Sequence, residues 1–364
     1  MMDIGDIIEE AMKKALKEIG EVNILIAGKT GVGKSTLINA VFQGDYATVG
    51  QGRPITKETR EIKKEGIPLT LWDTRGLELK DYKRTFAALE DLIKIRNKYN
   101  DPMKHIHMAW ICIDEGSRRV EDAEIELCEL LSHHMPVIAV ITKAVSDNGF
   151  RMEVIRLLEN AKNAVRVNSI PTVLDDGYVI QPTGLEELVE LSIEIVPEAQ
   201  RKAFVAAQKV SLKQKRDKAH AIVVAAATTA AGTAAMSIPF SDAVALIPIQ
   251  VGMLASITGV FGFELKKAFL MTLVSSTITA GGATLIGRSI VSSLFKLIPG
   301  AGSIAGGAIA ATTASAVTVA FGEVYISTLS FLLKDKDISE VNESDIIEEF
   351  KRRYLNKKKK IEEK

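Results

Sequence analysis

The sequence lacks several features that would point to a particular class of function. Its 46 Lys and Arg residues balance 46 Asp and Glu residues, so the formal net charge is zero. A chain without excess charge is not attracted as a whole to nucleic acid, and we expect no nucleic-acid partner. There are only two cysteines, Cys112 and Cys128, and neither these nor the five histidines have the spacing of a metal site.

The N-terminus also lacks a targeting pattern. No charged segment followed by an apolar core and a cleavage site opens the sequence, so we expect a reducing, cytoplasmic compartment. Residues 1–20 instead place Ile4, Ile7, Ile8, Met12 and Leu16 at helical spacing, with charges between them. This pattern predicts an amphipathic helix, and docking on the rest of the protein is favoured over lying on a membrane.

The stretch NILIAGKTGVGKSTLINAVF, residues 23–42, contains a glycine-rich loop between two apolar runs. Residues 22–27 have the composition of a buried parallel strand, and a helical period begins at Lys34. The loop at 28–35 matches GxxxxGK[ST], whose backbone N–H groups surround phosphate oxygens. Lys34 would reach the β- and γ-phosphates and the Ser35 hydroxyl would bind Mg²⁺. The loop therefore predicts a bound nucleoside di- or triphosphate.

A second motif follows in IPLTLWDTRGLE, residues 67–78. An apolar strand brings Asp73 to its carboxyl end, where it can hold Mg²⁺ through a water, and the backbone of Gly76 can approach the γ-phosphate. The order of these motifs resembles a GTPase of the translation-factor class, with Era-like and immunity-related GTPases nearest in pattern. The resemblance covers about residues 22–199. It implies an α/β P-loop NTPase fold, a G domain with a mostly parallel wound sheet over 21–199, and GTP or GDP with Mg²⁺ as ligands.

By this resemblance, the loop GQGRPITKETRE is the first switch. Thr56 is then the residue that closes over Mg²⁺ and the γ-phosphate, with Thr59 as the alternative. The segment after Gly76 is the second switch. Leu77 stands where Ras-type enzymes have a glutamine that orients the attacking water. We therefore expect slow hydrolysis, or a group supplied by a partner, a second copy or another part of the chain. Gly31 replaces an asparagine found in potassium-activated relatives, so such activation is not implied.

The base-reading element is expected in MPVIAVITKAVSDN, where a strand at 136–141 ends in Thr142 and Lys143. This ending is similar to the [NT]KxD signature, but Val145 occupies the aspartate position and the first carboxylate is Asp147. Losing two hydrogen bonds to a charged group would remove most discrimination between guanine and adenine. Either a two-residue bulge brings Asp147 to the base, which we favour, or base specificity is relaxed.

The last contact resembles the SA motif and falls on Asn168 and Ser169. The predicted nucleotide-binding residues are Gly28, Lys29, Thr30, Gly31, Val32, Gly33, Lys34, Ser35, Thr36, Asp73, Thr142, Lys143, Asp147, Asn168 and Ser169. The predicted metal ligands are Ser35, Thr56 and Asp73, and the predicted catalytic residues are Lys34, Thr56 and Gly76.

Composition changes near residue 197. A charged linker helix at 197–219 leads into four nearly charge-free stretches, at 219–241, 243–263, 268–287 and 297–322. Each approaches the ~20 residues that span a bilayer, but small residues dominate and Pro239, Pro248 and Pro299 interrupt the helices. The segment IPFSDAVALIPIQVGML resembles a motif of YcjF-type membrane proteins. We expect an all-α domain over 200–335, with peripheral association, membrane hairpins and a soluble bundle all open, and a charged helix or tail at 336–364.

Together these features predict a GTP-binding switch with slow Mg²⁺-dependent hydrolysis, coupled to a membrane-associated helical domain. The alternatives are a non-catalytic nucleotide-gated membrane or effector module, favoured by Leu77, and an ATPase, favoured by Val145. Expected partners are a membrane surface, a second copy or an effector protein. The expected location is cytoplasmic, peripheral at the inner membrane.

Overall fold

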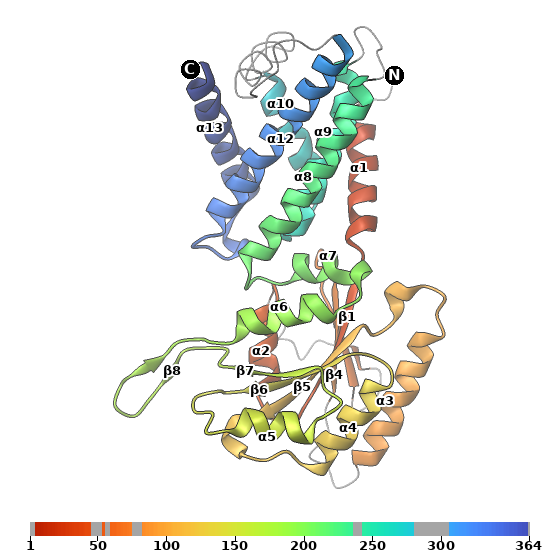
Figure 1. Ribbon diagram of the computed structural model, residues 1–364, viewed down its shortest axis with the longest axis vertical. Coiled ribbons are helices and arrows are strands. Elements are labelled where there is room, and N and C mark those ends of the chain that lie inside the picture. Colours follow the sequence, from red (N-terminus) through yellow and green to blue (C-terminus); the bar gives the residue numbers. More distant parts are fainter. Residues whose placement is uncertain are drawn as a thin grey trace. The chain divides into compact units, whose positions relative to one another are not determined.

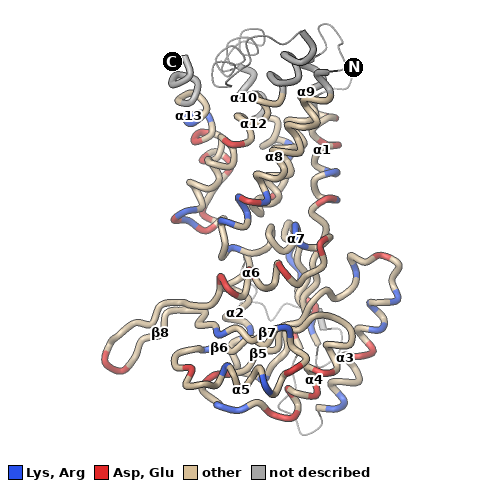
Figure 2. Tube along the Cα trace, in the orientation of Figure 1, with Lys and Arg blue, Asp and Glu red and all other residues tan. Residues whose placement is uncertain are grey.

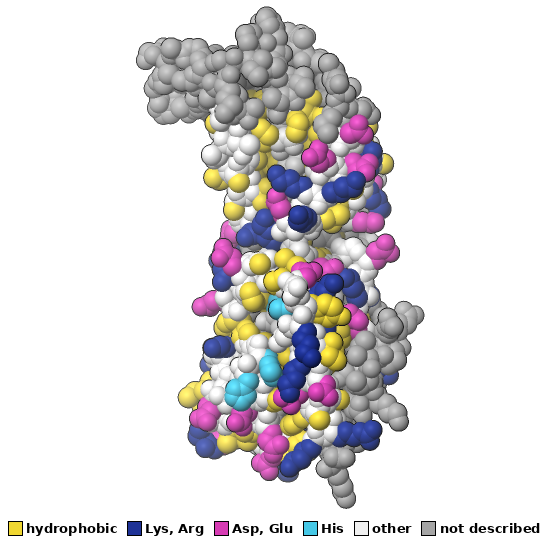
Figure 3. Space-filling view, turned by 90° about the vertical axis from the view of Figure 1, so that its right-hand side faces the viewer, with side chains coloured by type: hydrophobic (Ala, Val, Ile, Leu, Met, Phe, Trp, Pro, Cys, Tyr) yellow, Lys and Arg dark blue, Asp and Glu magenta, His cyan; other side chains and the backbone are white. Residues whose placement is uncertain are grey.

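The computed structural model describes residues 4–44, 53–54, 59–74, 82–235, 242–279 and 306–362. The chain divides into two compact units (Figure 1). One is formed by Gly20–Ser211, and the other by Met1–Ile19 together with Leu212–Lys364. On the face drawn in Figure 3, basic and acidic side chains are interspersed, as the zero net charge would lead one to expect.

The Gly20–Ser211 unit is built on a seven-stranded sheet in the order β2-β3-β4-β1-β5-β6-β7. Strands β4, β1, β5, β6 and β7 run parallel, and β2 and β3 add an antiparallel edge. The strands are β1 (Val22–Ala27), β2 (Arg53–Pro54), β3 (Thr59–Lys63), β4 (Leu69–Thr74), β5 (Met108–Asp114), β6 (Val137–Thr142) and β7 (Asn163–Val167). A separate hairpin pairs β8 (Thr172–Val173) with β9 (Val179–Ile180). The expected wound, mostly parallel sheet is confirmed.

Helices cover both faces of this sheet (Figure 1). They are α2 (Lys34–Val41), α3 (Tyr82–Asn97), α4 (Asp122–Ser132), α5 (Phe150–Leu157), α6 (Leu185–Ile195) and α7 (Glu198–Ala207), with short 3-10 turns at Pro102–Lys104 and Glu115–Ser117. Helices α3, α4 and α5 pack one face through Leu92, Leu131 and Val154. On the other face, Phe42 stacks on Trp110 with ring centroids 5.5 Å apart. Strands β1, β5 and β6 are buried on both faces, which explains why they read as continuous apolar runs.

The boundary between the units lies after Ser211, not at the expected 199/200. The linker is not one helix: α7 ends at Ala207, and the Gln208 side chain bonds both the N–H and the carbonyl of Ser211 before the next helix begins. Helix α7 stays with the sheet because Phe204 is buried there and Gln43 donates to the carbonyl of Ala206 at 2.8 Å.

The second unit is all helical, which confirms the expected fold class. Its elements are α1 (Ile4–Ile19), α8 (Leu212–Ala235), α9 (Asp242–Phe261), α10 (Lys267–Thr279), α12 (Gly306–Leu332), the 3-10 turn Ile338–Glu340 and α13 (Glu343–Glu362). Charged residues concentrate on α1, α13 and the start of α8 (Figure 2). The sequences of α9, α10 and α12 contain few charged residues.

Helix α1 docks on this unit, and part of the expected face is confirmed: Ile8 lies in the core and Met12 packs against it. Leu16 is instead 57% exposed, and the small side chains of Ala11 and Ala15 are buried, as is Ile19. The two alanines permit close approach to the neighbouring helices. At Gly259 of α9 the approach is so close that an added Cβ would lie 2.2 Å from Cδ1 of Ile19.

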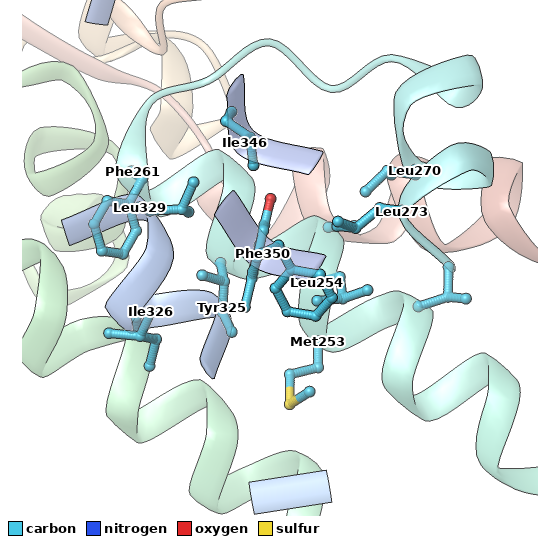
Figure 4. Packing of buried hydrophobic residues seen from close by; sticks show 14 of the residues in the cluster. Met253, Leu254, Phe261, Leu270, Leu273, Tyr325, Ile326, Leu329, Ile346 and Phe350 are labelled. Atoms are coloured by element: carbon cyan, nitrogen blue, oxygen red, sulfur yellow. The ribbon is translucent and has the colours of Figure 1, made fainter. Parts of the chain in front are cut away.

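The core of the helical unit gathers large side chains from α9, α10, α12 and α13 (Figure 4). Tyr325 and Phe350 meet edge to face at 5.7 Å, and the Tyr325 hydroxyl lies 2.7 Å from that of Thr258. Elsewhere the helices approach through small residues, as the composition suggested. A Cβ on Gly322 of α12 would lie 2.4 Å from Cγ2 of Val223 on α8.

Pro248 was expected to interrupt a helix, and this expectation is wrong: α9 continues through it. Proline removes one hydrogen bond, which the remaining bonds and packing of a 20-residue helix can outweigh. Pro239 and Pro299 lie outside the described residues. In the described part of the chain, one stretch, Ser315–Leu332, has the length and hydropathy of a membrane span, and 44% of it is buried. A single such helix is equally typical of a protein core.

Candidate nucleotide-binding site

The predicted site residues converge on one edge of the sheet. The parallel strands β4, β1, β5 and β6 are neighbours, so their carboxyl ends lie side by side. The loops that follow β1, β5 and β6 begin at Gly28, Glu115 and Lys143, and Asp73 lies near the end of β4. The glycine-rich loop is thus flanked by Asp73 on one side and by the two later loops on the other.

The 28–33 loop has the backbone shape that the glycine pattern predicted. Gly31 and Gly33 have φ of +79° and +101°, and Gly33 is the N-cap of α2. The N–H groups of the first helical turn, from Lys34, therefore point out of the helix toward the loop. Lys34 is buried and its Nζ donates to the carbonyls of Gly28 at 2.6 Å and Lys29 at 3.0 Å. An ammonium held against this loop, beside the free N–H groups of a helix N-terminus, is suited to binding phosphate.

Neighbouring strands support this loop from below. The Thr142 hydroxyl donates to the carbonyl of Val32 at 2.6 Å, which ties the loop to the end of β6. Cys112 of β5 lies beneath Gly28. Burial raises the pKa of the Cys112 thiol to about 12, so it stays protonated and serves as packing. Lys29 forms an ion pair with Glu121 at the start of α4.

Ser35 and Asp73 are the described residues suited to Mg²⁺. Ser35 is exposed in the first turn of α2, and Asp73 is only 8% exposed, beside Ile26 of β1. One hydroxyl and one carboxylate, completed by phosphate oxygens and waters, match the ligands that Mg²⁺ takes in phosphate sites. Among the described residues, no group of three or more His, Cys, Asp or Glu side chains could hold a metal ion.

The first switch is only partly visible. Thr59, the alternative switch residue, begins strand β3, pairs with Thr74 and is 1% exposed. A buried strand residue does not suit a loop that closes over a ligand. Thr56, Gly76 and Leu77 lie outside the described residues, so their predicted roles stay predictions.

The predicted base-reading loop runs from Lys143 to Gly149, between β6 and α5. Lys143 has φ of +52° and its Nζ lies 2.7 Å from Oδ2 of Asp114. Asp147 lies three residues before the first residue of α5, and its Oδ1 accepts from the N–H of Arg151 at 2.8 Å. The Val145 residue is 46% exposed, although its backbone N–H is bonded to Glu115.

Asn168 follows β7 and bonds the segment that carries the β8–β9 hairpin. It pairs with Thr183 through two backbone hydrogen bonds of 3.0 Å, and its side chain bonds Thr172 and the carbonyl of Gln181. Its side chain thus holds the hairpin-bearing segment, while Ser169 next to it is half-buried.

Three residues that the motifs did not reveal surround the base-reading loop: Glu115, Arg118 and Arg166. The Glu115 carboxylate is buried and accepts from Arg166 Nε at 2.6 Å and from the N–H groups of Val145 and Ser146. Burial alone would raise the pKa of Glu115, but the arginine and the two N–H groups outweigh it and lower the pKa. The sequence signal that could have revealed Glu115 is a carboxylate directly after a buried strand, in CIDEG.

Residues 23–143, which span β1 to the start of this loop, match the 50S ribosome-binding GTPase family. This segment has the fold of a P-loop GTPase G domain. Septin-9 of Rattus norvegicus is 27% identical to the chain over 169 residues, covering 39% of this chain and 29% of its own length. The tRNA modification GTPase MnmE of Desulfotalea psychrophila is 33% identical over 124 residues, covering 34% and 25%.

The chain therefore spans less than a third of the length of these two curated relatives. A crystal structure of a probable GTP-binding protein engB aligns with 48% of this chain and 98% of its own. Its TM-score is 0.33 and its sequence identity 16%. The match to the G domain ends before Asp147, so it does not extend to the unusual half of the base-reading loop.

Proposed function

We propose that the protein is a GTP-binding switch that hydrolyses GTP slowly with Mg²⁺, and whose nucleotide state controls the helical unit. The observation that carries this proposal is the glycine-rich loop: a buried Lys34 whose Nζ bonds the carbonyls of Gly28 and Lys29, within a segment that matches a GTPase family. Its membership of the Era-like class and the resemblance of the helical unit to YcjF-type domains are parts of the same proposal.

Each residue has a proposed role. The amides of the 28–33 loop and Lys34 bind the phosphates, Lys143 packs on the guanine and Asp147 accepts from its N1 and N2 groups. The N–H of Ser169 supplies the last backbone contact, because the N–H of Asn168 is bonded to the carbonyl of Thr183. Ser35, Thr56 and Asp73 hold Mg²⁺, which when bound neutralises charge on the β- and γ-phosphates. Gly76 senses the γ-phosphate, and the remaining proposed phosphate-loop contacts are Thr30, Val32 and Thr36.

Slow turnover is part of the proposal because Leu77 has no group that orients a water. The missing group would come from a second copy, an effector or another part of this chain. The helical unit, with its weakly charged α9, α10 and α12, is the proposed output. Its proposed site of action is the cytoplasmic face of the inner membrane, in peripheral contact.

The experiment that tests this proposal measures Mg²⁺-dependent binding of labelled GDP and of a non-hydrolysable GTP analogue, with ATP as competitor. It is run with and without anionic liposomes. We expect GDP to win over ATP by about 100-fold or more, the value for two lost hydrogen bonds to a charged group, and the analogue to change liposome partitioning. Equal competition by ATP would instead support the ATPase alternative, and partitioning that ignores the nucleotide would overturn the coupling.

A second candidate is a non-catalytic nucleotide-gated module, which the sequence position of Leu77 favours. The two candidates differ in single-turnover hydrolysis of GTP. Hydrolysis above background at high protein concentration or with liposomes supports the enzyme. A rate that stays at background under both conditions supports the module.

A further inference from the structure

The loop between β6 and α5 is two residues longer from Lys143 to its first carboxylate than the signature it resembles. A longer loop has more conformations, and ordering them costs entropy each time a ligand binds. In this protein, however, the loop is held on both sides by the turn after β5. The residues that hold it are Glu115 and Arg118.

Glu115 binds the backbone N–H groups of the loop. Its Oε2 accepts from the N–H groups of Val145 at 2.6 Å and Ser146 at 2.7 Å. Its Oε1 accepts from Nε of Arg166 on β7 at 2.6 Å. The Glu115 side chain is only 3% exposed, so water does not compete for these bonds.

Arg118 binds the backbone carbonyls of the loop. It has φ of +53°, and its guanidinium donates to the carbonyls of Ser146 and Asp147. The guanidinium also lies over the ring of Phe150, 5.8 Å from its centroid, at the first residue of α5. Three consecutive loop residues therefore have backbone groups bonded to the 115–118 turn.

Asp147 is fixed at the end of this arrangement. Its Oδ1 accepts from the N–H of Arg151, and Nε of Arg166 lies 3.7 Å from the same oxygen. Arg166 thus bridges Glu115 and Asp147, so the carboxylate that holds the loop and the carboxylate expected to read the base share one guanidinium.

We propose that Glu115 is a positioning residue that sets the preference for guanine over adenine, by holding the 143–147 segment in the shape that presents Asp147. The proposal rests on the proposed function, in which Asp147 reads the base. Glu115 does not touch the ligand, and the phosphate loop is built from other residues. Its loss should therefore weaken recognition of the base and leave recognition of the phosphates intact.

The test compares GDP and ADP affinities by calorimetry on the full chain, for wild type, Glu115→Gln and Arg118→Met. The amide keeps the shape of the carboxylate but has one acceptor oxygen, so it cannot satisfy both Arg166 and the loop amides. Since a hydrogen bond to a charged group is involved, we expect GDP affinity to fall about tenfold or more. ADP affinity should change less than about twofold. Arg118→Met alters an exposed residue, and it should also lower the ratio of GDP affinity to ADP affinity.

The matched control is Glu153→Gln, which removes an exposed carboxylate of α5 paired with Arg156 and should leave the ratio unchanged. Equal losses of GDP and ADP affinity in both loop variants, or a wild-type ratio in both, would overturn the role of Glu115. Wild-type protein without a preference for GDP over ADP would overturn the proposed base reading itself, which separates the two failures.

Discussion

Gly28 lies directly over the backbone of Cys112, and a Cβ added to Gly28 would come within 2.6 Å of the Cys112 carbonyl oxygen. The same glycine has φ of +148°, a conformation that L side chains rarely adopt. The first position of the phosphate loop is thus fixed by a neighbouring strand as well as by its own backbone.

Gly28→Ala should destabilise the G domain by about 1–3 kcal/mol from backbone strain alone, with a further cost from the contact. Both tryptophans, Trp72 and Trp110, are buried in this domain, so thermal melting followed by their fluorescence reports on it selectively. Gly31→Ala is the control, because a Cβ there meets nothing within 4 Å and only its φ of +79° is unfavourable. Equal melting temperatures for Gly28→Ala and wild type would contradict the packing described.

Lys34→Ala should abolish measurable GDP binding, with a loss of at least about 100-fold, because it removes the buried ammonium from the phosphate loop. Lys29→Ala removes only the ion pair with Glu121 at the surface, worth about 0–1 kcal/mol, and should lower GDP affinity less than about fivefold. Fluorescence-detected binding of labelled GDP measures both. Unchanged affinity in Lys34→Ala would mean that the phosphates bind elsewhere.

Asp147→Asn should change the base preference of the site from guanine to xanthine. The amide presents a donor where the carboxylate presents acceptors, so it pairs with the 2-oxo group of xanthine. We expect GDP affinity to fall about 10- to 150-fold. Asparagine can still cap α5 through the Arg151 N–H, so folding is retained. Asp122→Asn, in the exposed first turn of α4, is the control, and a persistent guanine preference in Asp147→Asn would place the base reader elsewhere.

Gly322→Ala should destabilise the helical unit by about 1–3 kcal/mol, since the new methyl group would overlap the stiff side chain of Val223. Gly252→Ala is a matched control within α9, where an added Cβ meets nothing within 4 Å, and it should stabilise by up to about 1 kcal/mol. Thermal melting by circular dichroism measures both changes, while tryptophan fluorescence should stay as in wild type. The same sign of effect in both variants would be inconsistent with close packing at Gly322.

Lys215 should make the stability of the helical unit depend on pH. Its side chain is buried, with Nζ donating to the carbonyls of Val260 and Phe261 at the end of α9. Burial lowers the pKa of Lys215 well below the model-compound value of 10.5. Between the folded pKa and 10.5 the unfolded chain binds the proton and the folded chain does not, so stability rises with pH in that window.

Lys215→Met should flatten this rise, whereas substitution of the exposed Lys213 of α8 by Met should preserve it. Urea unfolding of the helical unit at a series of pH values provides the measurement. A rise of equal slope in Lys215→Met would assign the pH dependence to other groups.

Local patterns were sufficient for much of the G domain. The strand expected at 22–27 is β1 and the helix expected from Lys34 is α2, because an apolar run and a glycine-rich turn encode them within a few residues. The bonds of Glu115 could not be predicted in this way. Its partners lie 30, 31 and 51 residues away in sequence, and only the closing of the sheet brings β5, β6 and β7 together.

The errors in the helical part share another cause. Of the large side chains predicted on one face of α1, Ile8 is buried and Met12 packs against the core, but Leu16 is exposed while Ala11 and Ala15 are buried. Hydrophobicity ranks leucine above alanine, but a close helix contact selects for small volume. Likewise, periodicity in the 197–219 linker gave no sign of the break formed by Gln208 and Ser211.

The placement of α1 in the helical unit has a consequence for how the chain folds during synthesis. Its main neighbours, α9 and α10, are translated more than two hundred residues later, whereas Gly20–Ser211 is continuous in sequence. At about 5–20 residues per second, α1 would wait roughly 10–50 s for its partners. The G domain could complete its own fold in that interval, leaving Ile8 and Ile19 exposed to chaperones until the second half of the chain emerges.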